Sequence, residues 1–288
     1  MGLGCNNFGL RLDLERTRAV VDAALGAGVT LLDTADTYGD SASEEFLGEI
    51  LQGRRDRVVL ATKFGGRMEG RGGGSRKHIH QAVAASLRRL QTDWIDVYQY
   101  HVPDGVTPIE ETLEALNELV QEGKVRFIGS SNFSTAQVEE ADAVARERGW
   151  ARFVSAQNQY SLLRREAEAE LLPTCERLGI GVLPYFPLAS GLLTGKYRRG
   201  ESAPEGTRLS GRGDAFTDQT FDRLEALEGY AAERGTTLLD VAVGGLLAHA
   251  PVASVIAGAT KPEQVRANVR AGEWQPSADD LAALDALR

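Results

Sequence analysis

The stretch Val29-Thr30-Leu31-Leu32-Asp33-Thr34-Ala35-Asp36-Thr37-Tyr38-Gly39 decides the fold of this chain. It begins as a short apolar run and changes abruptly into a polar segment with acidic residues. The apolar part does not alternate with polar residues, which is typical of a strand in a parallel sheet that helices cover on its outer face. Binding groups in such proteins gather at the carboxyl ends of the strands. The stretch therefore predicts a parallel α/β sheet with a functional site at its edge.

Seven other apolar runs of this kind follow the same rhythm. Most of them start about 26 to 37 residues apart, which is the length of a strand, a helix and their two connections. Helix boundary signals lie between them: Asp13, Ser41 and Ser134 precede predicted helices, with Gln137 completing the last signal, and Gly123 follows one. The eight predicted strands are Leu3–Cys5, Val29–Leu32, Val58–Ala61, Ile95–Tyr98, Val125–Ile128, Phe153–Ala156, Gly181–Leu183 and Ser254–Ile256.

The interval before the last predicted strand is longer than the others. We expect a long functional loop there, followed by helices from about Thr217 to Arg234 and from Leu238 to His249, with a final helix near Ser277. Eight strands alternating with helices most simply close into a (β/α)8 TIM barrel, so we predict an α/β barrel in a single domain over residues 1–288. A doubly wound open sheet is the alternative. It is disfavoured because no G-x-G-x-x-G turn follows the first strand.

Composition excludes several classes of protein. Lysine and arginine number 32 against 41 acidic residues, a formal net charge of −9, so we expect neither nucleic acid nor an anionic membrane as a partner. Cys5 and Cys175 stand far apart, which disfavours a disulfide framework and a structural zinc site. No apolar run reaches the length of about 18 residues that a membrane span needs. We expect a cytoplasmic protein, a monomer or weak oligomer.

Titratable residues follow three neighbouring predicted strands. Asp33 ends the second, Lys63 follows the third, and His101 follows the fourth, so we expect an ion pair between Asp33 and Lys63 beneath the loop that carries Tyr38. A tyrosine phenol has an ordinary pKa of about 10, and a nearby cation lowers it. Lys63 would therefore make Tyr38 a better proton donor near neutral pH, and a neutral His101 would orient a substrate oxygen. The scheme needs no metal, but it needs a source of hydride.

These residues resemble the catalytic tetrad of the aldo-keto reductases. The resemblance rests on Asp33 and Tyr38 in Asp-Thr-Ala-Asp-Thr-Tyr-Gly, Lys63 in Ala-Thr-Lys-Phe-Gly and His101 in Tyr-Gln-Tyr-His-Val-Pro-Asp. It implies reduction of an aldehyde or ketone by NADPH, with Tyr38 as general acid. The cofactor would be NADPH/NADP+, with NADH still open, because Gly258, Ala259 and Gln264 stand where many members carry Lys, Ser and Arg.

The resemblance also implies a set of cofactor contacts. Ser131, Asn132 and Gln157 would bind the nicotinamide carboxamide, Tyr185 would stack on its ring, and Gly258 to Thr260 would meet phosphate at a helix start. Gln264 and Asn268 would lie near the adenine. The remaining predicted contacts lie at the first strand and in the segment after the seventh strand: Gly4, Cys5, Asn6, Phe186, Pro187, Leu188, Ser190, Gly191, Lys196 and Arg208.

Some interpretations stay open at this point. Family members normally place a β-hairpin before the first strand, and because this sequence starts within that strand we expect a barrel without the hairpin. An NADPH-binding regulatory or redox-sensing subunit with little turnover is one alternative function, and a Schiff-base lyase using Lys63 is another. The substrate would be a small carbonyl compound. Its identity would be set by the loops at residues 65–75, 102–107 and 192–214.

Overall fold

Eight short strands form one sheet in the order β7-β6-β5-β4-β3-β2-β1-β8, and all of its pairings are parallel. The computed structural model describes residues 1–66, 73–210 and 217–287. Every predicted strand is present in it, with boundaries shifted by a few residues. The strands are β1 Gly2–Gly4, β2 Leu31–Asp33, β3 Val59–Phe64, β4 Ile95–Tyr100, β5 Val125–Ser131, β6 Phe153–Gln157, β7 Gly181–Val182 and β8 Ile256–Gly258.

The sheet closes on itself between its first and last members. No regular ladder joins β7 to β8 in the described residues, but isolated parallel bridges pair Val182 with Val252 and Tyr185 with Ile256. The backbone N–H of Ile256 donates to the carbonyl oxygen of Pro184 at 3.0 Å, and that of Ala253 donates to Val182 at 3.0 Å. With this closure the eight parallel strands and their helices form a (β/α)8 barrel, as the sequence predicts.

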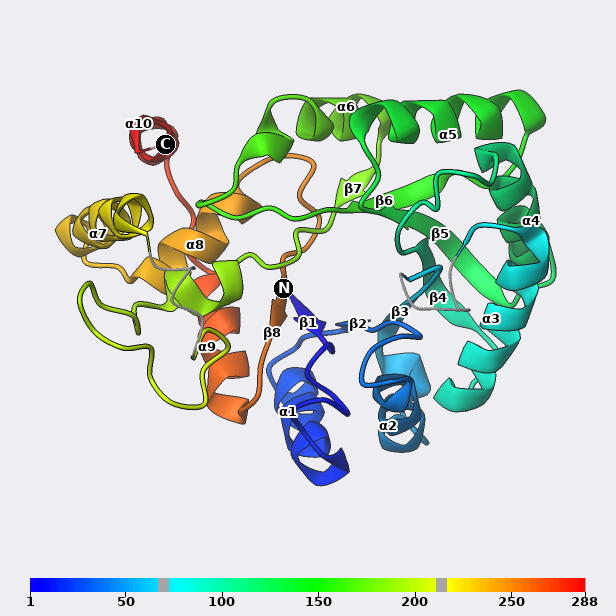
Figure 1. Ribbon diagram of the computed structural model, residues 1–288, viewed down its shortest axis with the longest axis horizontal. Coiled ribbons are helices and arrows are strands. Elements are labelled where there is room, and N and C mark those ends of the chain that lie inside the picture. Colours follow the sequence, from blue (N-terminus) through cyan, green and yellow to red (C-terminus); the bar gives the residue numbers. More distant parts are fainter. Residues whose placement is uncertain (67–72, 211–216, 288) are drawn as a thin grey trace.

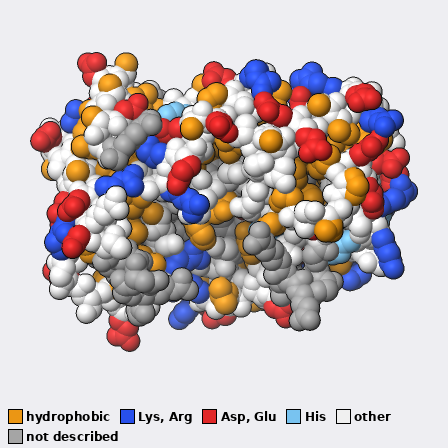
Figure 2. All heavy atoms as spheres, turned by 45° about the horizontal axis from the view of Figure 1, so that its top comes forward, with side chains coloured by type: hydrophobic (Ala, Val, Ile, Leu, Met, Phe, Trp, Pro, Cys, Tyr) orange, Lys and Arg blue, Asp and Glu red, His pale blue; other side chains and the backbone are white. Residues whose placement is uncertain are grey.

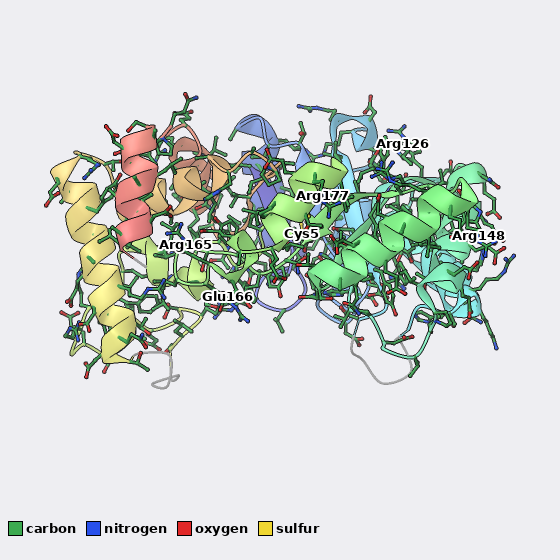
Figure 3. The ribbon with its side chains drawn as sticks, turned by 90° about the horizontal axis from the view of Figure 1, so that it is seen from above. Cys5, Arg126, Arg148, Arg165, Glu166 and Arg177 are labelled. Atoms are coloured by element: carbon green, nitrogen blue, oxygen red, sulfur yellow. The ribbon has the colours of Figure 1, made fainter. Side chains whose placement is uncertain are left out.

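Helices surround the strands (Figure 1). The helices predicted at 217–234 and 238–249 are confirmed as α7 and α8, and the one predicted near Ser277 is α10. The side chains of Tyr230 on α7 and Asp280 on α10 form a 2.7 Å hydrogen bond, and these two helices lie side by side at one end of the molecule (Figures 1 and 3). The helices are α1 Leu14–Gly26, α2 Ala42–Ile50, α3 Arg76–Leu90, α4 Ile109–Gln121, α5 Thr135–Arg148, α6 Leu171–Leu178, α7 Asp218–Glu233, α8 Leu238–Leu247, α9 Pro262–Ala271 and α10 Ala278–Ala286, with short 3-10 turns η1 Arg55–Arg57, η2 Glu166–Glu168 and η3 Ala189–Thr194.

The helix starts predicted after Asp13, Ser41 and Ser134 are confirmed, although the side chain of Ser41 does not form a capping hydrogen bond. Asp13 accepts from the N–H of Arg16, and Ser134 with Gln137 forms a reciprocal capping box, so both satisfy otherwise unpaired donors. Ser41 precedes α2 as predicted but does not cap it with its side chain. Its hydroxyl donates instead to the carbonyl oxygen of Asp36 at 2.8 Å, and its backbone is left-handed with φ +78°. Ser41 thus folds the loop that carries Tyr38.

One close contact between helices depends on a glycine. Gly48 lies on α2 where this helix packs against the end of α3, and a Cβ atom added there would overlap the carbonyl oxygen of Arg89. Nearby, the fully buried carboxylate of Glu44 accepts hydrogen bonds from Thr62 and Arg89, which ties α2 to both β3 and α3. These contacts fix α2, and with it the loop just before it.

Two broader sequence expectations concern the cysteines and the membrane. Cys5 and Cys175 are both free and buried, so neither takes part in a disulfide. Within the described parts of the chain, no helix combines the length and apolarity required for a membrane span. Acidic and basic side chains are interspersed over the face drawn in Figure 2.

Candidate active site

The predicted ion pair between β2 and β3 is present and fully enclosed. Lys63 Nζ donates to Asp33 Oδ2 at 2.7 Å, and the two side chains are 0% and 3% exposed. The same ammonium group donates to the carbonyl oxygen of Thr34 at 2.8 Å and to Tyr38 Oη at 3.3 Å. Lys63 thus uses its three donors on one carboxylate, one backbone carbonyl and the phenol. The arrangement places a fixed positive charge directly beside the hydroxyl of Tyr38.

Burial and charge act in opposite directions on these groups. Burial lowers the pKa of Lys63, but the Asp33 carboxylate and Tyr38 raise it, and the net pKa lies above the ordinary value, so Lys63 is charged. Burial raises the pKa of Tyr38, and this outweighs the lowering by Lys63. Lys63 thus lowers the pKa of Tyr38 as predicted, but the net pKa stays above the ordinary value because burial disfavours the phenolate more than the ammonium group favours it. Tyr38 carries its proton at neutral pH.

His101 lies beside Tyr38 at the end of β4. The two rings meet edge to face, with centroids 5.9 Å apart and planes at 79°. Burial, with a smaller contribution from Lys63, lowers the pKa of His101 to about 3. The imidazole is therefore neutral at physiological pH, as the sequence-based scheme requires. Its Nδ1 atom is buried without a hydrogen-bond partner among the described residues, which is costly unless a ligand supplies one.

A pair of buried amides holds the other oxygen of Asp33. Gln157 Nε2 donates to Asp33 Oδ1 at 2.8 Å, and Gln99 Nε2 donates to the same atom at 3.1 Å. Gln157 also donates to Gln99 Oε1 at 3.1 Å. Sequence analysis identified Gln157 but missed Gln99, which is completely buried on β4. Its signal was available, because Gln99 pairs in register with Lys63 and a glutamine within an apolar strand needs a polar partner.

Asn132 links three strand ends around the site. Its side-chain amide donates to the carbonyl oxygen of His101 at 2.9 Å and to Ser131 Oγ at 3.1 Å, and its oxygen accepts from Tyr185 Oη at 2.7 Å. The residue is left-handed, with φ +60°, a conformation that asparagine tolerates better than most side chains. Asn132 therefore fixes the phenol of Tyr185 and the backbone of His101 relative to each other.

A cleft of about 780 Å³ opens above these groups at the carboxyl ends of the strands. Lys63 lies beneath its floor and does not line it. Every other predicted site residue does: Gly4, Cys5, Asn6, Asp33, Tyr38, His101, Ser131, Asn132, Gln157, Tyr185, Phe186, Pro187, Leu188, Ser190, Gly191, Lys196, Arg208, Gly258, Ala259, Thr260, Gln264 and Asn268. The lining residues that were not predicted as site residues are Asn7, Arg11, Thr194, Glu205, Gly206, Thr207, Leu239, Ile256, Ala257, Lys261 and Ala267.

Arg11 is the least expected of these lining residues. It lies in the loop after β1, and its guanidinium donates to the carbonyl oxygen of Thr207 at 3.3 Å. This bond connects the first loop to the long segment after β7 across the cleft. A contact between residues so far apart in the sequence leaves no local pattern that could predict it.

Of the three predicted substrate loops, the one after β4 is described throughout. Asp104 holds it by accepting from the N–H groups of Gly74, Val106 and Thr107 and from the Thr107 hydroxyl. These bonds keep the pKa of the Asp104 carboxyl well below its usual range, against the effect of burial. In the other two predicted loops, residues 67–72 and 211–214 lie outside the described residues.

Comparison with known proteins places this geometry in a family. Residues 1–288 match the family model described as the Aldo/keto reductase family. The chain belongs to the aldo/keto reductases. It is 37% identical over 286 residues to an uncharacterized oxidoreductase of Bacillus subtilis, covering 94% of this chain and 86% of the relative. It is 36% identical over 278 residues to a probable voltage-gated potassium channel subunit beta of Oryza sativa, covering 92% of this chain and 84% of the relative, and 34% identical over 283 residues to an Arabidopsis thaliana protein of the same description, with 93% and 85% covered.

Family membership and the bacterial relative support an oxidoreductase, and aldo/keto reductases typically bind NAD(P)H. The cleft of this chain fits such a ligand in size and charge. Its volume lies within the usual range for ligand sites, and it carries Lys196, Arg208 and Lys261 in a chain of net charge −9.

One group predicted to contact phosphate already has a hydrogen-bond partner within the chain. Gln264 Oε1 accepts from the N–H of Thr260 at 2.7 Å and from its hydroxyl at 3.2 Å. The N–H of Thr260 was predicted to meet phosphate at the start of α9. Gln264 must turn away before Thr260 can serve an anion, whereas Lys261 lines the cleft next to it.

Proposed function

We propose that this aldo/keto reductase uses NADPH to reduce an aldehyde or ketone to an alcohol, with Tyr38 as the proton donor. The observation that carries the proposal is the contact of Lys63 Nζ with both Asp33 and Tyr38 beneath a cleft of dinucleotide size. Nicotinamide, when bound, supplies the hydride that a carbonyl carbon accepts. We further propose a small carbonyl compound as substrate, no nucleic-acid or membrane partner, and a monomer or weak oligomer.

Tyr38 is suited to give a proton in this reaction. The hydroxyl is protonated at neutral pH, because the ordinary pKa of tyrosine is about 10 and burial raises it further, and its proton can pass to the oxygen of a carbonyl as negative charge develops there. Loss of that proton leaves a phenolate within reach of the Lys63 ammonium. The attraction between these two charges appears only as the proton leaves, so it stabilises the transition state more than the ground state.

Asp33 and His101 prepare the site for this transfer. Asp33 holds Lys63 in one position and is itself held by Gln99 and Gln157, so no group needs to reorganise during the step. The neutral imidazole of His101 is able to donate one hydrogen bond to the substrate oxygen and to orient it toward Tyr38.

The remaining cleft residues would hold the dinucleotide. Tyr185, whose ring is fixed through Asn132, offers a flat surface for the nicotinamide. The phosphates would meet the basic side chains of Lys196 and Arg208, and Lys261 would favour the additional phosphate of NADPH over NADH.

The deciding experiment is a titration with NADPH and with NADH, followed by quenching of intrinsic fluorescence, and then NADPH oxidation across a panel of aldehydes and ketones. We expect tighter binding of NADPH and turnover of at least one carbonyl class. Tyr38→Phe is the matched variant, because it keeps the ring and removes only the proton donor. Unchanged turnover in Tyr38→Phe would exclude the assigned acid, and binding of neither cofactor would overturn the proposal.

A second candidate function is supported by the plant relatives. Because proteins described as probable potassium channel beta subunits are 34–36% identical to this chain, a cofactor-binding regulatory subunit with little turnover is the alternative. Tight NADPH binding with negligible rates across the carbonyl panel would favour it. The geometry does not favour a Schiff-base lyase, since Lys63 is buried, charged and already bonded to three oxygen atoms.

A further inference from the structure

A second cavity of about 340 Å³ lies next to the cleft, and the proposed function makes no use of it. Phe186 and Ser190 line both spaces, so the segment after β7 forms a shared wall. The opposite side of the small cavity is formed by the loop after β6 and by the first turn of α7. This arrangement separates the cavity from the catalytic residues while keeping it in contact with the cofactor side of the cleft.

The lining of the small cavity is cationic. Arg164 and Arg223 contribute to it, and no carboxylate is present among its described lining residues. The hydroxyl groups of Ser161 and Thr220 and the amide of Gln219 add neutral polar groups. The two arginines are thus the only charged side chains among the described lining residues of this cavity, in a chain of net charge −9, and arginine recognises carboxylate and phosphate groups well.

No described lining residue of the cavity neutralises either arginine. Arg223 donates through its terminal nitrogens to the carbonyl oxygens of Leu162 and Leu163, and its Nε is buried without a partner among the described residues. Arg164 donates to the amide oxygen of Gln159 at 2.7 Å. Its salt bridge to Glu166 is long, at 3.8 Å, and the Glu166 side chain is 77% exposed, so solvent screens this pair.

The first turn of α7 adds to the positive potential. This helix runs from Asp218 to Glu233 with Thr217 as its N-cap, and Gln219 and Thr220 in its first turn line the cavity. Asp218, the acidic residue of that turn, is 95% exposed, pairs with Arg199 and does not line the cavity. The helix start therefore reinforces the two arginines.

The wall between the cavities has an unfavourable backbone. Phe186, Ala189 and Ser190 are left-handed, with φ values of +52°, +46° and +60°, a conformation that costs free energy in residues with a side chain. Contacts on either face of this wall therefore help to decide whether it keeps its conformation. Burial raises the pKa of Tyr185 in the cleft, and the charge of Arg164 partly opposes this rise, so this charge is felt across the wall.

We propose that the small cavity binds one oxyanion group, a carboxylate or a phosphate, and that its occupancy strengthens NADPH binding through the shared wall. The anion would lie between Arg164 and the start of α7. The second part rests on the proposed function, since it needs NADPH in the cleft. Coupling of this kind is reciprocal, so NADPH strengthens anion binding by the same factor.

Calorimetric titration of the protein with acetate and, separately, with inorganic phosphate tests the site, with chloride at matched ionic strength as the reference. We expect one site for at least one of the two anions, and Arg164→Ala to weaken it about tenfold, the loss of one charge-assisted contact. Arg164→Lys keeps the charge and should restore part of the affinity. Arg198→Ala is the matched control, because Arg198 is 52% exposed against 56% for Arg164 and pairs with Glu228 outside the cavity.

Phosphate is also able to enter the cofactor cleft, and Lys261→Ala identifies that contribution. Binding that falls in Lys261→Ala but not in Arg164→Ala belongs to the cleft and overturns the proposed site. NADPH affinity, measured with and without the anion, tests the coupling: a tighter NADPH complex in the wild type but not in Arg164→Ala supports it, and an unchanged one overturns it. If NADPH does not bind at all, the proposed function fails, while the direct titration still decides the anion site.

Discussion

Replacing Lys63 with methionine removes the charge from the buried pair and leaves a side chain of similar length. The Asp33 carboxylate then stays 3% exposed without its cation, although Gln99 and Gln157 still donate to it. Breaking a buried ion pair on one side costs about 3–5 kcal/mol, and the two amides place the expected loss near the lower end, about 3 kcal/mol. Domains are stable by only about 5–15 kcal/mol, so this loss is a large share of the total.

Urea unfolding followed by tryptophan fluorescence measures this loss. With a denaturant slope of about 3 kcal/mol/M, a loss of about 3 kcal/mol lowers the midpoint by about 1 M. Lys124→Met is the matched control, since Lys124 and Glu122 are similarly close, at 2.6 Å, but 45% and 44% exposed, and such surface pairs contribute about 1 kcal/mol or less. A midpoint in Lys63→Met that moves no more than in the control refutes the reasoning.

The double variant Asp33→Asn with Lys63→Met sharpens this test. The double variant leaves no charge in the pair, and the amide oxygen of the asparagine at position 33 still accepts from Gln99 and Gln157, so we expect it to be more stable than either single variant.

The contribution of Lys63 to stability also has a defined pH range. The folded pKa of Lys63 is raised, so its contribution is complete below the ordinary pKa of 10.5 and disappears only as the pH rises through the folded value. The difference between wild type and Lys63→Met should therefore be constant from about pH 6 to 9.

Three other predictions separate chemistry from stability. Tyr38→Phe loses only the 3.3 Å contact to Lys63, so we expect unfolding free energy to change by at most about 1 kcal/mol while carbonyl turnover falls about 10²–10⁴-fold, measured by urea unfolding and NADPH oxidation. The pKa of His101 is lowered to about 3 in the folded protein, so as the pH drops the imidazole becomes protonated in the unfolded chain first, and stability falls from about pH 6.5 toward pH 3. Urea midpoints measured at neutral and acidic pH should therefore fall less in His101→Gln than in the wild type. An equal fall in both proteins contradicts the assignment. Gly48→Ala places a methyl group against the carbonyl oxygen of Arg89 and should lower the unfolding free energy by about 1–3 kcal/mol, although alanine favours helices more than glycine does. A melting temperature at or above that of the wild type would contradict the close packing of α2 on α3.

Much of the fold follows from local sequence patterns. Each strand combines an apolar run with a polar end, and signals such as Asp13 and the Ser134–Gln137 box act within a few residues, so they are readable without the structure. Ser41 is a residue whose contacts the local pattern does not predict. It precedes a helix as a capping residue should, yet its hydroxyl bonds to Asp36 because the loop turns back on itself.

The candidate site was predictable in its residues but not in its energetics. Asp33, Tyr38, Lys63 and His101 lie at or after the carboxyl ends of strands, and parallel strands bring these ends together without further information. The pKa of Tyr38 depends on how completely the surrounding loops exclude water, which no single residue reveals. The hydrogen bond from Thr260 to Gln264 could not be predicted for a related reason. The sequence shows that Thr260 has an N–H donor, but it does not show which acceptor binds that donor.

The irregular closure between β7 and β8 has a dynamic consequence. Tyr185 and Gly258 both line the cleft and come from the two sides of this junction, which is joined in the described residues by bridges in place of a continuous ladder. Segments with few backbone bonds open at lower free energy than the rest of a domain. Amide hydrogens of Val182, Ala253 and Ile256 should therefore exchange with solvent faster than those in the middle of β4. Their exchange rates measure how often the barrel loosens at the point where a dinucleotide would enter and leave.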